Sequence, residues 1–185
     1  MSPLIWRFFK LLYGQPEGVS YFGKNAKEGN NWFIAFQLQQ LYNHFSFIEN
    51  ALKLIPGAYS YWLRLWGSSI GQKVIWTSGA QIVDRTHLKI GSRVLLGNQS
   101  YLTAHIIKKK NKRYLLYVKD VEIGDDVVLA FQCVISPGVK IEDEAFVEAG
   151  GVLYPNQKLE KGMTHERFKE LLGNRFYSLL KKHRE

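Results

Sequence analysis

Cysteine is almost absent from this chain, since Cys133 is the single thiol among 185 residues. An internal disulfide is therefore excluded, and we expect a reducing compartment. Long hydrophobic runs are also missing, and none approaches the ~20 residues that a membrane-spanning helix needs. Arg7 and Lys10 interrupt the apolar N-terminal stretch and no cleavage-site pattern follows, so we expect no signal peptide. These absences predict a cytoplasmic protein.

Negative charge is scarce as well. The sequence has 16 acidic residues against 25 Lys and Arg residues, which gives a formal net charge of +9 at pH 7. This balance favours anionic partners, such as a phosphate-bearing co-substrate, a membrane surface or nucleic acid. Because the basic run of residues 108–113 is short and no recognised nucleic-acid motif accompanies it, we predict no nucleic-acid partner.

A period of six residues dominates the second half of the chain. An aliphatic residue recurs at every sixth position, and a small or aliphatic residue follows four positions later. Neither a helix nor an alternating strand keeps this period. It is typical of a solenoid of short strands and tight corners, in which each unit buries its apolar side against its neighbours. The first series is Ile123, Leu129, Ile135, Ile141, Val147 and Leu153, with Ile90, Leu96 and Leu102 before it, and the second is Val127, Cys133, Val139, Ala145 and Gly151.

The six-residue phase slips between Leu102 and Ile123. Counting back from Ile123 brings Tyr117 into register, which leaves fifteen residues where six would suffice. The extra residues must leave the coil, and we predict an inserted loop over residues 106–116. His105 stands directly before this loop. Its imidazole titrates near neutral pH, so its neutral form is a candidate general base.

The repeat, the inserted loop and this histidine make residues 70–155 resemble the hexapeptide-repeat acyltransferases, in particular the sugar O-acetyltransferases of surface-polysaccharide biosynthesis. The resemblance implies a mainly β fold, the left-handed parallel β-helix, and a homotrimer with active sites between subunits. The handedness comes from the resemblance alone, because crossover connections between parallel strands are otherwise right-handed.

Three regions follow from the position of the repeats. Residues 1–70 are predicted to be helical, with one helix along the aliphatic stripe of residues 34–55 and a loop over residues 14–31. Residues 71–157 are predicted to form the β-helix. Residues 158–185 are predicted to be a C-terminal helix and a basic tail.

A further helix is predicted between Ser2 and Gly14. An aromatic and apolar face opposite cations is typical of an interfacial membrane anchor. Packing on a partner subunit explains the same pattern equally well. A membrane contact would place the protein at the inner face of the membrane. The apolar face carries Leu4, Ile5, Phe8, Phe9 and Leu12, and the cations are Arg7 and Lys10.

In the family that the chain resembles, a histidine beside an extruded loop is the catalytic base, and His105 is the matching position. His87 lies eighteen residues earlier, one predicted coil, so the two should stack on the same face. His87 is the reserve candidate for a substrate contact. Asn98 stands at a repeat corner, where similar transferases place a substrate-contacting asparagine, although an Asn at a turn is often structural. We predict no metal site, because the hexapeptide carbonic anhydrases use three histidines and the repeats hold no third.

Acetyl-CoA or another acyl-CoA is the co-substrate that the resemblance implies. Lysines of the inserted loop could hold its phosphates or could form a solvated loop tip. Small residues of the later coils would allow its close approach, although the corners of the fold demand small residues equally. The predicted cofactor-binding residues are Lys108, Lys110, Ala130, Ser136, Ala149 and Gly150.

The resemblance therefore predicts an acyl-CoA-dependent O-acyltransferase that acetylates a sugar hydroxyl of a surface glycan or its lipid-linked precursor. One alternative is an acyltransferase for an amine or an apolar acceptor at the membrane. Another is a non-catalytic β-helix scaffold. The sequence leaves open the acceptor, the acyl chain length, and whether the donor is CoA or an acyl carrier protein.

Overall fold

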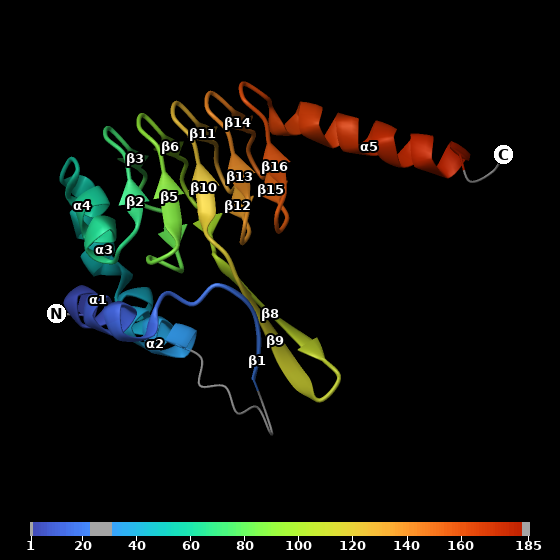
Figure 1. The fold of residues 1–185 in the computed structure, drawn as a ribbon. Helices are drawn as coiled ribbons and strands as arrows, with labels where there is room; N and C mark the ends of the chain where they lie inside the picture. The colour runs from blue at the N-terminus through green and yellow to red at the C-terminus, as the bar shows by residue number, and fades with distance from the viewer. Residues whose placement is uncertain (1, 23–30, 183–185) are drawn as a thin grey trace.

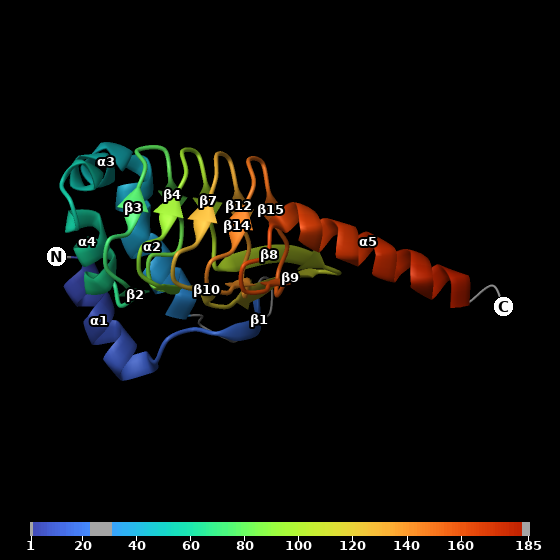
Figure 2. The same cartoon turned by 90° about the horizontal axis from the view of Figure 1, so that it is seen from above.

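Stacked coils of short strands form the centre of the molecule, with helices at both ends (Figures 1 and 2). The computed structural model describes residues 2–22 and 31–182. Each complete coil contributes one strand to each of three parallel sheets. The strands of the first sheet are β2 (Ser69–Ile70), β5 (Leu88–Ile90), β10 (Val121–Ile123), β13 (Lys140–Ile141) and β16 (Lys158–Leu159). Those of the second are β3 (Ile75–Trp76), β6 (Leu95–Leu96), β11 (Val128–Leu129) and β14 (Phe146–Val147). Those of the third are β4 (Gln81–Ile82), β7 (Tyr101–Leu102), β12 (Val134–Ile135) and β15 (Val152–Leu153).

The predicted parallel β-helix is confirmed, and its sense is left-handed. In Figure 1 the chain ascends the near side through the first sheet, passes over the top and descends the far side while it advances toward the C-terminus. That combination of rotation and advance is the left-handed one. The general preference for right-handed crossovers is therefore overridden here.

Both six-residue series of the sequence point into the coil. Leu129, Ile135 and Val147 are 0 % exposed, and so is Cys133 of the small series. Each two-residue strand supplies one inward side chain, whereas the three-residue strands β5 and β10 each supply two. Within the regular repeats, a small or aliphatic inward residue precedes the next strand. The chain turns the corner by a residue with a left-handed backbone, and Asp126 (φ 58°) is one example. The period of six is thus the spacing from one side of the three-sided coil to the next.

The coils do not all have the same length. Ser69 pairs with Lys89, twenty residues on, whereas Glu122 pairs with Lys140, eighteen residues on. The first complete coil is therefore two residues longer than the repeat predicts. The extra residues lie after β4, at the corner between the third and first sheets.

The inserted segment is a β-hairpin rather than a loop. Strands β8 (His105–Lys110) and β9 (Arg113–Val118) are antiparallel, and β1 (Gly18–Phe22) adds to the free edge of β9. The prediction of a loop over residues 14–31 is therefore wrong for β1. Leu116 and Val118 of the hairpin pack with Trp32 in a small core of their own, which stabilises the hairpin against α2.

The N-terminal region contains α1 (Ser2–Tyr13), α2 (Asn31–His44), α3 (Ser46–Leu54) and α4 (Ala58–Leu65). The predicted single helix over residues 34–55 is two helices that break at Phe45. The face of α2 that the fold buries carries Trp32, Ala35, Gln39 and Tyr42 rather than the aliphatic stripe. Leu41 and Phe45 of that stripe are each 49 % exposed. Tertiary packing by the two aromatic residues outweighs the aliphatic pattern.

The C-terminal helix α5 (His165–Lys182) follows β16 and projects away from the last coil (Figures 1 and 2). Strand β16 extends the first sheet into the segment predicted to be helix and tail. His165 is 1 % exposed, and Phe168 packs against the core of the β-helix. The predicted tail residues from position 183 onward lie outside the described residues. None of the described helices is long and apolar enough to cross a membrane.

Candidate functional site

His105 lies at the corner between the third and first sheets, where the chain leaves β7 and enters β8. Its Nδ1 is 2.7 Å from Oδ2 and 2.9 Å from Oδ1 of Asp84. The Asp84 side chain is 2 % exposed and that of His105 is 16 % exposed. A buried carboxylate thus faces one nitrogen of an imidazole whose ring still reaches the surface.

Asp84 is held as an anion by its other neighbours. Its Oδ2 accepts hydrogen bonds from the backbone amide of Ala104 at 2.7 Å and from the hydroxyl of Thr103 at 3.2 Å. Burial alone would raise the pKa of this carboxyl. The hydrogen bond and charge of His105 and the Ala104 amide outweigh burial, so the pKa of Asp84 lies below its usual value. An ionised Asp84 accepts a hydrogen bond from Nδ1–H and so fixes the imidazole tautomer.

Helix α2 closes one side of the imidazole. The Trp32 ring centroid is 4.6 Å from that of His105, and the Phe36 ring centroid is 6.2 Å from it. No described residue hydrogen-bonds Nε2 of His105. The ring is therefore held by a carboxylate and two aromatic side chains, and its second nitrogen remains free to take a proton.

Asp84 was missed by the sequence reasoning. A signal for it exists, because the pairing of Gln81 with Tyr101 sets a coil of twenty residues and brings Asp84 next to the corner of His105. An assumed coil of eighteen residues placed His87 there instead. The predicted stacking of His87 on His105 is therefore wrong.

His87 is a structural residue in this fold. Its side chain is 1 % exposed, Nδ1 lies 2.7 Å from the Thr86 hydroxyl, and Nε2 lies 2.8 Å from the Pro16 carbonyl oxygen. Both ring nitrogens are thus engaged inside the protein. The histidine ties the segment after α1 to the β-helix.

The other predicted site residues fall into separate groups. Asn98 and Ala130 lie at the corner between the second and third sheets, where the Asn98 carbonyl accepts from the Gln132 amide. Ala149 and Gly150 occupy the same corner one coil further on. Ser136 instead lies near the corner of His105. Lys108 and Lys110 are exposed on β8, where alternation directs both away from the face that carries His105.

A cavity of about 450 Å³ lies between α3 and the third sheet. Its lining includes Val83 and Arg85, the two neighbours of Asp84 in the chain, but neither Asp84 nor His105. Arg85 and Glu49 both line the cavity and form an ion pair, with Nη2 of Arg85 2.8 Å from Oε2 of Glu49. The remaining polar lining is mostly uncharged and includes Asn43, Ser46, Asn50, Ser78, Gln81 and Tyr101.

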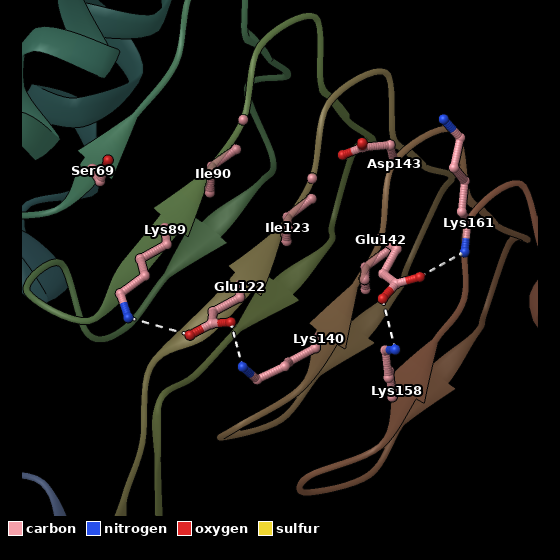
Figure 3. Close-up of a pocket in the computed structure, with 13 residues that line it drawn as sticks. Ser69, Lys89, Ile90, Glu122, Ile123, Lys140, Glu142, Asp143, Lys158 and Lys161 are labelled. Carbon is pink, nitrogen blue, oxygen red and sulfur yellow. Dashed lines mark hydrogen bonds and ion pairs between the residues drawn. The ribbon is translucent and has the colours of Figure 1, made fainter.

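A larger, shallower groove of about 920 Å³ crosses the outer face of the first sheet (Figure 3). Glu122 lies 3.2 Å from Lys89 and 2.7 Å from Lys140, and Glu142 lies 2.6 Å from Lys158. These charges pair from coil to coil, so most of the charged groups that line the groove are already engaged. It is a ladder of ion pairs, and His105 does not line it.

Metal ligands do not gather in the described part of the chain: no group of three His, Cys, Asp or Glu side chains there has the required geometry. The fold and the site together define a class, a three-sided parallel β-helix of six-residue repeats with a buried carboxylate–imidazole pair at one corner.

Comparisons with known proteins gave matches among solved structures only. No family model and no curated protein matches the sequence. A hexapeptide-repeat acetyltransferase of Vibrio cholerae O1 biovar eltor, solved with acetyl-coenzyme A, is 23 % identical over 52 % of this chain and 54 % of that one, with a TM-score of 0.48. A maltose O-acetyltransferase of Clostridium difficile 630 is 12 % identical over 80 % of this chain and 87 % of that one, with a TM-score of 0.48. The chain thus spans about half the length of the first of these structures.

Proposed function

We propose that this protein is an acyl-CoA-dependent O-acyltransferase with His105 as its general base. The pairing of His105 with the buried Asp84 supports this most directly. A carboxylate that accepts from Nδ1 leaves the lone pair of the imidazole on Nε2, which is the arrangement that a base needs. A non-catalytic β-helix scaffold does not require a buried anion that orients an imidazole at the surface.

The reaction proceeds by direct transfer. Nε2 of His105 takes the proton of an acceptor hydroxyl while the hydroxyl oxygen attacks the thioester carbonyl carbon. The tetrahedral intermediate collapses, the carbon–sulfur bond breaks, and the CoA thiolate takes the proton back from Nε2–H. Asp84 stays ionised throughout and stabilises the imidazolium that forms. The products are the acyl ester and free CoA.

The hairpin supplies the positive charge that the phosphates of an acyl-CoA require. Lys108 and Lys110 are exposed and form no ion pair with a described residue. Because they lie on the opposite face of β8 from His105, we propose that they bind the phosphates, which are remote from the thioester, rather than the reacting atoms. Acetyl-CoA is the donor that we propose to test first.

The cavity between α3 and the third sheet, which Val83 and Arg85 line, favours an uncharged, hydroxyl-bearing acceptor such as a sugar. Its amide and hydroxyl groups suit hydroxyl ligands, and Tyr101 offers an apolar ring face. An ammonium acceptor would need a free carboxylate there. Glu49, the carboxylate of this cavity, is already paired with Arg85. A sugar hydroxyl is therefore favoured over an amine as the acceptor.

We also propose a homotrimer. The outer face of the second sheet carries an apolar row across four coils, and Ile75 and Phe146 in it are 58 % and 38 % exposed. A row of this kind supports contact with another subunit. The row consists of Ile75, Leu95, Val128 and Phe146. Light scattering of the purified protein tests the assembly, and a monomer at micromolar concentration contradicts it.

A cytoplasmic location of the protein fits the proposed acyl-CoA donor.

Thermal unfolding with and without acetyl-CoA tests the donor, because a ligand at one hundred times its Kd adds about 2.7 kcal/mol. Release of the CoA thiol with a panel of sugar acceptors then tests transfer. We expect His105→Ala to lose at least about 100-fold in rate. His44→Ala, at the exposed end of α2, is the matched control and should keep its rate. If acetyl-CoA at millimolar concentration does not stabilise the wild type against thermal unfolding, the hypothesis of an acyl-CoA donor is rejected.

A further inference from the structure

Helix α1 presents an apolar face to solvent. Leu11 is 86 % exposed, Leu4 is 66 % exposed and Phe8 is 60 % exposed. In a helix these positions recur at intervals of three and four residues, so they share one side. The complete set of exposed apolar residues in α1 is Leu4, Ile5, Phe8, Leu11, Leu12 and Tyr13.

The opposite side of α1 is firmly attached. Trp6 is 1 % exposed and packs with Trp66 and Tyr42 in a core between α1, α2 and α4. Arg7 donates through Nε to the carbonyl of Leu65 at 3.0 Å and through Nη2 to that of Arg64 at 2.8 Å. The orientation of the helix is thus set by specific contacts, which hold the apolar side outward.

A second surface adds positive charge on the same side of the molecule. Figure 1 shows α1 beneath α3 and α4 and the β8–β9 hairpin below the stacked coils, both on the lower side of the molecule in that view. The hairpin contains no acidic residue, and its exposed cations make no ion pair with a described residue. These cations are Lys108, Lys109, Lys110, Lys112 and Arg113.

We infer that the apolar face of α1 inserts into an anionic lipid surface, with the hairpin cations on the headgroups. An amphipathic helix that lies in the interface gains from apolar burial and from attraction to anionic lipid together. A second copy of the chain is the weaker occupant, because the subunit contact proposed above uses a different surface, the outer face of the second sheet.

The test is co-sedimentation of the full chain with vesicles. Neutral vesicles contain phosphatidylcholine alone, and anionic vesicles contain phosphatidylcholine with phosphatidylserine. We expect binding to the anionic vesicles and at least tenfold weaker binding to the neutral ones. Phe8→Asp with Leu11→Asp should lower the anionic binding at least tenfold. Lys112→Ala with Arg113→Ala, which spares the two lysines proposed for the CoA phosphates, should weaken it and flatten its dependence on salt.

Leu171→Asp with Leu172→Asp is the matched control, since both leucines are exposed on α5 at the other end of the β-helix. It should bind vesicles as the wild type does. Equal binding by the α1 variant, or no binding by the wild type, overturns the inference. A change of oligomeric state in the α1 variant without vesicles also overturns it, in favour of a subunit contact. None of these readouts depends on acyl transfer, so the proposed function can fail separately.

Discussion

Replacing Asp84 by Asn tests the proposed site most sharply, because the change keeps the shape and removes the charge. The carboxylate accepts from three donors: the Ala104 amide at 2.7 Å, Nδ1 of His105 at 2.7 Å, and the Thr103 hydroxyl at 3.2 Å. A carboxamide has one acceptor oxygen and turns an NH₂ group toward one of these donors. Hydrogen bonds to a charged group contribute about 1.5–3 kcal/mol each. We expect Asp84→Asn to lower the free energy of unfolding by about 2–4 kcal/mol at neutral pH.

The pH dependence of this loss has a definite sign. The pKa of Asp84 is lower in the folded protein than its ordinary value, so the ionised group stabilises the fold above the ordinary carboxyl pKa of about 4. That stabilisation is lost as the pH falls through the lower pKa of the folded state. The Asp84→Asn variant has no such titration. The difference in stability between wild type and variant should therefore shrink below about pH 4.

Urea unfolding at neutral and acidic pH measures the loss of unfolding free energy. Release of the CoA thiol measures the loss of acyl-transfer rate. We expect the rate to fall by about 100- to 10,000-fold, because Nδ1 of His105 loses its acceptor and the wrong tautomer becomes available. Asp126→Asn is the control, since Asp126 is exposed and paired with Arg93 at the surface. An unchanged unfolding midpoint and an unchanged rate for Asp84→Asn would refute the role of this pair.

Three further predictions concern the fold. Leu129→Ala should cost about 2–5 kcal/mol of unfolding free energy because Leu129 is 0 % exposed. The control Leu54→Ala, at an 81 % exposed position, should change that free energy little. Equal effects of the two variants in urea unfolding would contradict the inward orientation of Leu129. Glu49→Ala should cost about 3–5 kcal/mol because it leaves Arg85 buried without its partner, and a loss below about 1 kcal/mol would contradict that pairing. Burial raises the pKa of the Cys133 thiol to about 11, so an aromatic disulfide reagent at pH 8 should label it only after unfolding; rapid labelling of the folded protein would show that this corner opens.

The sequence by itself determined the central architecture. The period of six is a local property, since the residues of each series become the inward side chains of successive strands. Ile123, Leu129 and Ile135 are all buried as their spacing predicts. The slip of phase after Leu102 likewise located the excursion from the coil and the histidine beside it.

The tertiary structure decided the rest, because those features depend on contacts between distant segments. The length of a coil is fixed by which strands pair, and the twenty-residue first coil puts Asp84 rather than His87 beside His105. The buried face of α2 is chosen by Trp32 packing against the hairpin and the imidazole, which no pattern within residues 31–44 reveals. The six-residue spacing of inward side chains is enough by itself to specify that the coils stack. The contact between Asp84 and His105 depends on the register in which strands of different coils pair, and only the folded chain supplies that.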